Sequence, residues 1–238
     1  MLSVIIPAHN CRAAVPAFVR RWSEVVSART DIEVLVTDNA SSDGTPDCIE
    51  REAALLHEKN IRVLRIPHTM QHGQLLLAGM KHASGDLMSF TASLQDSYPG
   101  ELTPLYETWR LNNEISLFVK CRRTGLSIPR RMEEIFLGML SQRLLGYRMH
   151  DVYCCPKLFS RVFYNKYLRK GAPQDETFDL HAVYCAAKNG RIIENDRDLH
   201  RDRQGKATEE FKAHESAKAL GKAMASLREK LIPEDKPE

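Results

Sequence analysis

The sequence of 238 residues has no long hydrophobic run, no large excess of charge and no paired cysteine motif. A helix that spans a bilayer needs about 20 consecutive apolar residues, and the apolar runs here are far shorter. The 34 basic and 31 acidic residues nearly balance, which does not favour a general nucleic-acid binder. We therefore expect a soluble protein with no nucleic-acid partner, in which any basic binding site is local.

The six cysteines are neither spaced as CxxC pairs nor dense enough for a secreted disulfide scaffold. The first segment, MLSVIIPAHN, is not typical of a signal peptide, because no basic stretch precedes its apolar run. These features predict reduced thiols and a cytoplasmic location, with attachment to a membrane surface left open.

Short β-branched runs alternate with helical patterns along the first half of the chain. We expect strands at residues 3–6, 33–36, 62–66, 87–90 and 115–119, and helices at 13–27, 45–59, 73–83 and 101–112. This alternation predicts an α/β fold with one mostly parallel central sheet and helices on both faces. We place this single domain at residues 1–208, followed by a charged helix and frayed tail at 209–238. Beyond the fifth strand we expect helices at 132–145 and 179–188 and a strand at 191–194.

Polar segments follow the expected strands. They are PAHN at 7–10, TDNASSDGT at 37–45, PHTMQHG at 67–73 and TASLQD at 91–96. Ligands of parallel sheets bind beyond the carboxyl ends of the strands, so these segments are the first candidates for a site. Asp38 ends the second strand, where a carboxylate can accept hydrogen bonds from a nucleotide base or ribose. Asp43 is well placed to cap the helix that starts near Thr45.

Basic residues gather at two places late in the chain. The first group is Lys120, Arg122, Arg123, Arg130 and Arg131, and the second is His200, Arg201, Arg203 and Lys206. Guanidinium groups match phosphate geometry, so we expect at least one group to bind phosphate, although a solvated surface is the alternative for any single residue. The amphipathic helix at 132–145 is expected to pack on the sheet, with a membrane surface as the alternative.

Histidines suggest a metal ion at one position only. His68 and His72 stand four residues apart, a spacing that zinc ligands often have. No third ligand can be assigned from the sequence, so we predict no zinc site there.

Several segments resemble glycosyltransferase family 2, which has the Rossmann-like GT-A fold. PAHN and DNASSDGT, separated by a helix, resemble the nucleotide-binding start of the family, and HGQLLLAGMKHASGD resembles its third helix. DVYCCPKLF, FDLHAVYCAAKNGRIIE and HRDRQGKAT are similar to later segments of its branch of dolichyl- and polyprenyl-phosphate mannosyl- and glucosyltransferases. The resemblance extends to about Thr208. It implies that the nucleotide-binding residues are Pro7, Ala8, His9, Asn10, Asp38, Asn39, Thr91 and Ser93.

The resemblance places TASLQD on the family's DADLQD-like motif, whose two acids hold a divalent metal against the donor diphosphate. Those positions are Thr91 and Ser93 here. Neutral hydroxyls are poor ligands for Mg²⁺ or Mn²⁺. Gln95 and Asp96 remain, and Asp96 alone would hold a metal loosely. We therefore expect no tight metal site.

Three further positions depart from the family in the same direction. Cys11 stands where an acid commonly follows the asparagine, His9 replaces a tyrosine, and His181 replaces the glutamate of the late helix. We expect these positions to face the same cleft, which would then have lost several ionisable groups.

The function implied is inverting transfer of a sugar from a UDP- or GDP-sugar to an acceptor like polyprenyl phosphate. The implied catalytic residues are Gln95, Asp96, Arg122, Arg131 and Arg203, with the arginines at the phosphates. The missing acids leave one main alternative, a binding or regulatory protein that kept the fold and lost the reaction. A nucleotidyltransferase is disfavoured, because no glycine-rich phosphate loop follows the first strand. The oligomeric state stays open.

Overall fold

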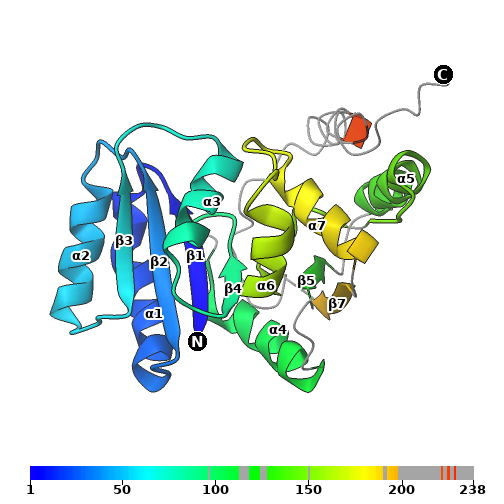
Figure 1. The fold of residues 1–238 in the computed structure, drawn as a ribbon. Helices are drawn as coiled ribbons and strands as arrows, with labels where there is room; N and C mark the ends of the chain where they lie inside the picture. Colours follow the sequence, from blue (N-terminus) through cyan, green and yellow to red (C-terminus); the bar gives the residue numbers. More distant parts are fainter. Residues whose placement is uncertain are drawn as a thin grey trace.

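A sheet with helices on both faces forms the body of the protein (Figure 1). The computed structural model describes residues 1–95, 97–112, 118–123, 128–149, 151–189 and 192–197, and positions 221, 224, 225 and 228. For residues 112, 118–123, 129, 130, 133, 134 and 192–197 it describes the backbone alone.

The first half of the chain alternates strand and helix, as predicted. Its strands are β1 (Leu2–Ala8), β2 (Ile32–Asn39), β3 (Ile61–Ile66) and β4 (Leu87–Phe90). Its helices are the 3₁₀ helix η1 (Arg12–Ala14), α1 (Val15–Ala28), α2 (Thr45–Leu55), α3 (His72–His82) and α4 (Pro99–Asn112). α2 is shorter than predicted, because His57 adopts a left-handed φ of 56° that ends the helix.

The second half of the chain is less regular. It comprises β5 (Phe118–Arg123), α5 (Ile128–Leu145), β6 (Lys157–Ser160), α6 (Arg161–Phe163), the π-helical turn η2 (Tyr164–Leu168), α7 (Phe178–Asn189) and β7 (Ile192–Arg197). The sequence did not predict β6, α6 or η2. All four residues of β6 are buried and the first is a lysine, so this strand shows neither alternation nor an apolar run.

The seven strands lie in the order β3-β2-β1-β4-β6-β5-β7. All neighbouring pairs are parallel except those of β6, which runs antiparallel to β4 and to β5. The prediction of a mostly parallel sheet is therefore confirmed. Because β4 and β5 both oppose β6, they run in the same direction, and their carboxyl ends lie at the same edge of the sheet.

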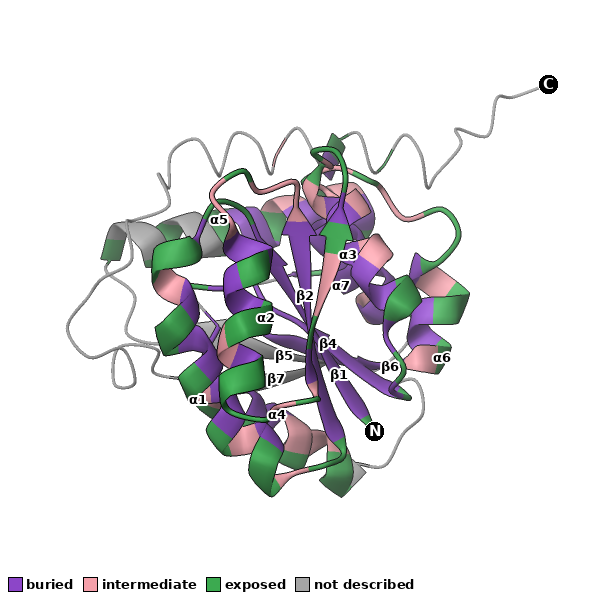
Figure 2. Cartoon of the chain, turned by 90° about the vertical axis from the view of Figure 1, so that its left-hand side faces the viewer, coloured by how far each residue is buried: buried purple, intermediate pink, exposed green. Residues whose placement is uncertain are grey.

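Side chains that alternate along β1 belong to two separate cores. Val4 and Ile6 pack with residues of α1, α2 and α4, such as Trp22. Ile5 packs on the opposite face with residues of α3 and α7, such as Phe178. Figure 2 shows the buried strands between these helices. Burial on both faces explains why the strands appear in the sequence as short continuous apolar runs.

Gly79 lets α3 approach the sheet closely. A Cβ atom at this position would lie 2.5 Å from Cγ2 of Ile5 and 2.7 Å from Cγ2 of Thr37. Real Cβ atoms do not come so close to other atoms, so a larger residue would push α3 away from β1 and β2.

Helix α5 is apolar on two sides. Leu137, Ser141 and Leu145 are buried. A second set, which we call the α5 stripe, is between 43 % and 78 % exposed and consists of Ile128, Met132, Ile135, Phe136 and Met139. One side of α5 therefore packs inside the protein, as predicted. The exposed side leaves contact with a membrane surface as a prediction. Among the helices described, none is long and apolar enough to cross a membrane.

Candidate functional site

The carboxyl ends of β1, β2 and β4 bring together three of the polar segments identified in the sequence. Ala8 lies opposite Asp38 in the register of β1 and β2. The segment after β4 runs along the end of β1, where Leu94 donates its N–H to the carbonyl of Pro7 at 3.0 Å. Residues 7–10, 38–45 and 91–95 therefore form one continuous feature, which we call the rim.

Asp38 is the one described carboxylate of the rim that is nearly closed off from solvent, at 3 % exposed. Its Oδ2 accepts a hydrogen bond from the N–H of Ser41 at 3.1 Å. Its Oδ1 is buried and has no hydrogen-bond partner in the described part of the chain. Leaving a buried acceptor unpaired costs about 1–3 kcal/mol, and more for a charged group. The unpaired oxygen agrees with the predicted role of Asp38 in accepting an N–H or O–H from a ligand, and that role stays a prediction.

His9 and Asn10 join the loop after β1 to the loop after β2. His9 Nδ1 lies 2.7 Å from the carbonyl oxygen of Asn39, and it donates to this oxygen in the tautomer that carries a hydrogen on Nδ1. Asn10 receives the N–H of Ser42 on its side-chain oxygen at 2.9 Å, and donates its own N–H to the hydroxyl of Ser41 at 2.9 Å. Asn10 also takes a left-handed φ of 45°. These bonds set the shape of the predicted nucleotide-binding loop.

Asn39 holds the segment after β3 against the rim. Its amide nitrogen donates to the carbonyl of Met70 at 3.0 Å, and its amide oxygen accepts the N–H of Met70 at 2.7 Å. Both polar atoms of the side chain are therefore used within the protein. Asn39 positions the rim, while its predicted contact with a nucleotide stays a prediction.

Asp43 was predicted to cap α2, but the N-cap residue is Gly44, and Asp43 supports the start of the helix from one residue before it. Its Oδ1 accepts the N–H of Thr45 at 2.9 Å, and its Oδ2 accepts the N–H of Arg12 at 3.0 Å. Hydrogen bonds from Thr45 and Arg12 lower the pKa of Asp43, so it remains charged. Burial raises the pKa of the neighbouring Cys11 thiol, which therefore stays neutral and does not replace an acid at that position.

The described residues of TASLQD have only neutral side chains with which to bind a metal ion. Thr91 is buried, and its hydroxyl donates to the carbonyl of Ser93 at 3.4 Å. Gln95 is exposed, and Asp96 lies outside the described residues. In the part of the chain that the structure describes, no three His, Cys, Asp or Glu residues are grouped as metal ligands. Hydroxyls and an amide do not fit the preference of Mg²⁺ for charged oxygen ligands.

Arg122 lies on β5, at the same edge of the sheet as the rim. Phe90 of β4 pairs with Lys157 of β6, which pairs with Lys120 of β5. Arg122 is therefore two residues beyond the level at which β4 ends. Two strand spacings place β5 about 10 Å from β4, which is within the span of a nucleoside diphosphate sugar.

The structure gives less information on the predicted catalytic residues Arg131, Arg203 and Asp96. Arg131 is exposed on α5. Arg203, like Asp96, lies outside the described residues. The roles of all three residues stay predictions.

A buried charge cluster below the rim was not identified as a site from the sequence. Lys157, which has no exposed surface, forms an ion pair with Asp179 of α7. Asp179 also accepts from Nε2 of His72 at 2.8 Å, and Nζ of Lys157 lies 5.0 Å from the ring centre of Phe90. The signal in the sequence was a charged residue within each of two apolar segments, KLFS and FDLHAVYC.

Asp179 stabilises the charged forms of both Lys157 and His72, while the charge of Lys157 opposes protonation of His72. Burial alone would lower the pKa of Lys157, but the negative charge of Asp179 outweighs it and raises that pKa. Burial would raise the pKa of Asp179, but Lys157 and His72 lower it. Both groups therefore stay ionised, with their charges paired inside the protein.

His181 does not lie where the sequence suggested. Its ring is buried, with Nε2 3.2 Å from the carbonyl oxygen of Tyr167 and 3.4 Å from Sγ of Cys185. Burial lowers the pKa of His181, which favours the neutral ring. The expectation that this position faces the same cleft as the rim is wrong, because packing of α7 against η2 encloses the side chain.

Solved structures with a similar backbone define the class of the fold. Glucosyl-3-phosphoglycerate synthase from Mycobacterium tuberculosis, crystallised with UDP, matches with a TM-score of 0.68 and 18 % identity, over 96 % of this chain and 80 % of that one. TarS from S. aureus, crystallised with UDP-GlcNAc, matches with a TM-score of 0.53 and 17 % identity, over 82 % of this chain and 58 % of that one. The chain is therefore a single α/β domain of the GT-A type.

Sequence comparison then identifies the family. The profile of glycosyl transferase family 2 matches residues 3–168, and the chain belongs to this family. Undecaprenyl-phosphate 4-deoxy-4-formamido-L-arabinose transferase of Salmonella choleraesuis is 27 % identical over 71 % of this chain and 51 % of its own length. The enzyme of the same name from Aeromonas hydrophila is 28 % identical over 68 % of this chain and 49 % of its own length. The chain thus spans about half the length of these relatives. A likeness to polyprenyl-phosphate sugar transferases is confirmed, while the predicted branch of mannosyl- and glucosyltransferases stays a prediction.

Proposed function

We propose that this chain transfers a sugar from a nucleoside diphosphate sugar to an acceptor like polyprenyl phosphate. The observation that carries this proposal is the unpartnered Oδ1 of Asp38 at the rim. Uracil and guanine each present a ring N–H that this oxygen can accept. Membership of family 2 supports sugar transfer, and the relatives that act on undecaprenyl phosphate support the lipid acceptor.

In the proposed reaction an oxygen of the acceptor phosphate attacks the anomeric carbon of the donor sugar. The bond between that carbon and the diphosphate oxygen breaks, and its electron pair leaves with the nucleoside diphosphate. Attack opposite the leaving group inverts the configuration. The acceptor phosphate is already an anion at neutral pH, so the protein orients it and needs no general base to activate it.

The leaving diphosphate gains negative charge that the protein must stabilise. The described residues of TASLQD are neutral, so we propose that the arginines supply most of the positive charge. The end of β5 at the same edge as the rim supports this role for Arg122. Arg131 and Arg203 are proposed to bind the phosphates of donor and acceptor, and Gln95 and Asp96 to contact the transferred group.

The exposed apolar residues of the α5 stripe support the proposal that the protein acts at a membrane surface. Its exposed apolar side chains belong to a helix that also carries the exposed cations Arg131 and Arg143. A helix with apolar and basic residues on its open side binds the interface of an anionic membrane. We propose that this contact brings the protein to its lipid-linked acceptor.

A second candidate is a protein that binds nucleotide sugars without transferring them. The described residues of TASLQD favour it, because their neutral hydroxyl and amide groups are poor ligands for a metal ion that would assist the departure of the diphosphate. Both candidates require an occupied rim, and they differ only in turnover.

The test combines binding with turnover. Purified protein is titrated with UDP, GDP and their sugars in a calorimeter, with EDTA and with Mn²⁺, and then incubated with undecaprenyl phosphate in detergent. Binding together with release of nucleoside diphosphate and labelling of the lipid supports the transferase. Binding without release of nucleoside diphosphate supports the binding protein. If no nucleotide binds, both candidate functions are wrong.

A further inference from the structure

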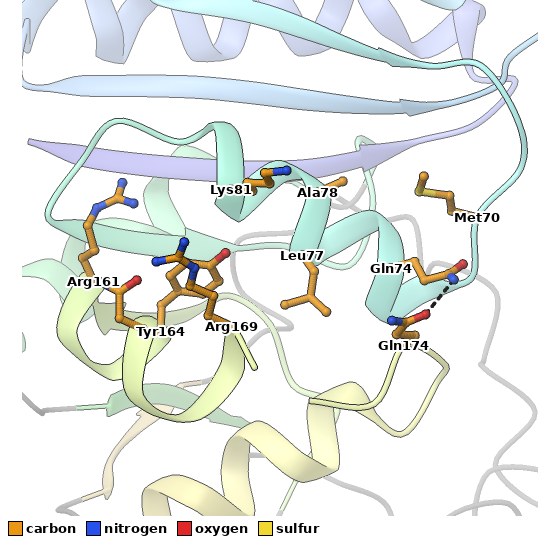
Figure 3. A pocket seen from close by; sticks show the side chains of 10 residues that line it. Met70, Gln74, Leu77, Ala78, Lys81, Arg161, Tyr164, Arg169 and Gln174 are labelled. Carbon is orange, nitrogen blue, oxygen red and sulfur yellow. Dashed lines mark hydrogen bonds between the residues drawn. The ribbon is translucent and has the colours of Figure 1, made fainter. Parts of the chain in front are cut away.

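A groove lies between α3 and the segment formed by α6 and η2 (Figure 3), and only its end at Met70 adjoins the rim. Its volume is about 620 Å³. Met70, Leu77 and Ala78 line an apolar wall along α3. Three cations, Lys81, Arg161 and Arg169, lie toward the other end, and none of the described residues that line the groove is Asp or Glu.

The basic end of the groove is at the opposite edge of the sheet from the rim. α3 starts beside the carboxyl edge and runs back, so Lys81 in its last turn lies toward the amino edge. Arg161 follows directly after β6, whose last residue, Ser160, pairs with Leu87 at the start of β4. A ligand bound among these cations would not compete with a nucleotide at Asp38.

Arg161 is held in place by carbonyl groups and not by an acid. Its Nε donates to the carbonyl of Gly85 at 2.8 Å, and its Nη2 donates to that of Ala83 at 2.7 Å. Within the described part of the chain, Arg161, Lys81 and Arg169 make no ion pair. The guanidinium group of Arg161 is therefore fixed in direction, and the described carboxylates neutralise none of the three cations.

Tyr164 adds a hydroxyl donor between two of these cations. Its side chain is 5 % exposed, lines the groove, and makes no side-chain hydrogen bond in the described chain. Burial raises the pKa of Tyr164, while the nearby charges of Arg169 and Arg161 oppose the rise. The hydroxyl therefore stays protonated and can donate to an anion beside both guanidinium groups.

We propose that this groove binds a phosphate group, with the carbon portion of the ligand on the apolar wall. Two guanidinium groups, an ammonium group and a hydroxyl provide donors from several directions, which suits a tetrahedral oxyanion with several acceptor oxygens. The phosphate belongs either to a small phosphorylated metabolite or to a phospholipid headgroup, and these sources share the recognised chemistry.

Two probes distinguish the sources. n-Butyl phosphate is titrated into the protein and followed by backbone amide shifts in NMR spectra, and vesicles of phosphatidylcholine with phosphatidic acid are sedimented with it. The variants are Arg169→Gln, Lys81→Gln and Tyr164→Phe. The matched control is Lys170→Gln, which removes an exposed charge beside Arg169 that does not line the groove.

We expect n-butyl phosphate to shift amides of residues 161–169, and Arg169→Gln and Lys81→Gln each to weaken its binding about tenfold, as loss of one charge-assisted hydrogen bond predicts. Lys170→Gln should bind like the wild type. If only the vesicles bind, and Arg169→Gln and Lys81→Gln weaken that binding while Lys170→Gln does not, the ligand is a phospholipid headgroup. Binding of both probes that is equal in all variants, or no binding of either probe, overturns the proposal. UDP titration of each variant reports whether the fold and the rim are intact.

Discussion

Lys157 and Asp179 form an ion pair with almost no access to solvent, between strand β6 in the sheet and helix α7 above it. The lysine has no exposed surface and lies opposite Phe90, the last residue of β4 before the rim. The pair therefore links the packing of α7 to the position of TASLQD. His72, at the start of α3, binds the same carboxylate, so Asp179 joins β6, α3 and α7.

Removing the lysine should destabilise the protein strongly. Lys157→Met leaves Asp179 charged, buried and bonded only to His72, which predicts a loss of about 3–5 kcal/mol in the free energy of unfolding. Urea denaturation measures this loss. The double variant Lys157→Met with Asp179→Leu should recover part of it, because no lone charge remains. A single variant within about 1 kcal/mol of the wild type would contradict this account.

Stability should depend on pH through His72. Burial lowers its pKa, but the hydrogen bond and charge of Asp179 outweigh this and raise the pKa above its ordinary value of 6.5. The contribution of protonated His72 is therefore fully present below pH 6.5 and is lost as pH rises through the raised pKa. Unfolding measured between pH 5.5 and 8.5 should show this loss in the wild type, and a flatter profile in His72→Gln. The exposed His68→Gln serves as control, and the same profile in both variants would refute the assignment.

Asp38 should determine nucleotide affinity. Asp38→Ala removes the unpartnered acceptor and is expected to weaken binding of the favoured nucleoside diphosphate by about 1.5–3 kcal/mol, since a hydrogen bond to a charged group is lost. Calorimetric titration measures the change. Asp86→Ala removes an exposed carboxylate at the other edge of the sheet and should leave affinity unchanged. Wild-type affinity in a folded Asp38→Ala protein would rule out nucleoside recognition by this residue.

Metal dependence should be weak in the wild type and should appear when acids are restored. Thr91→Asp with Ser93→Asp places two carboxylates at the end of β4, where a divalent ion can bridge them to a diphosphate. Without metal the new charges repel the diphosphate, so affinity should fall in EDTA and recover with Mn²⁺. Steep Mn²⁺ dependence in the wild type would show that Gln95 and Asp96 already make a metal site.

The α5 stripe should be required for membrane binding. Phe136→Ser removes a side chain that is 58 % exposed, and we expect less protein to sediment with anionic vesicles because apolar contact with the bilayer is lost. Val162→Ser, at an exposed apolar position on α6, is the control. Equal sedimentation of both variants would exclude α5 as the contact.

Local patterns in the sequence determined much of the sheet and of the rim. Alternating β-branched runs and helical periods identified β1 to β4, and the parallel arrangement alone predicted that PAHN lies beside DNASSDGT. Ala8 does lie opposite Asp38. This prediction was possible because the carboxyl ends of parallel strands meet at one edge, whatever the details of packing.

Only the tertiary structure decided the features that depend on distant partners. β6 is a strand because β4 and β5 enclose it, and its four residues contain no periodic signal of their own. Lys157 meets Asp179 across 22 positions of the chain, and Asp179 meets His72 across 107. The position of His181 likewise depends on how α7 packs against η2, and the basic groove depends on how α3 lies beside α6 and η2. Such contacts follow from the burial of whole elements, which a local pattern of residues does not encode.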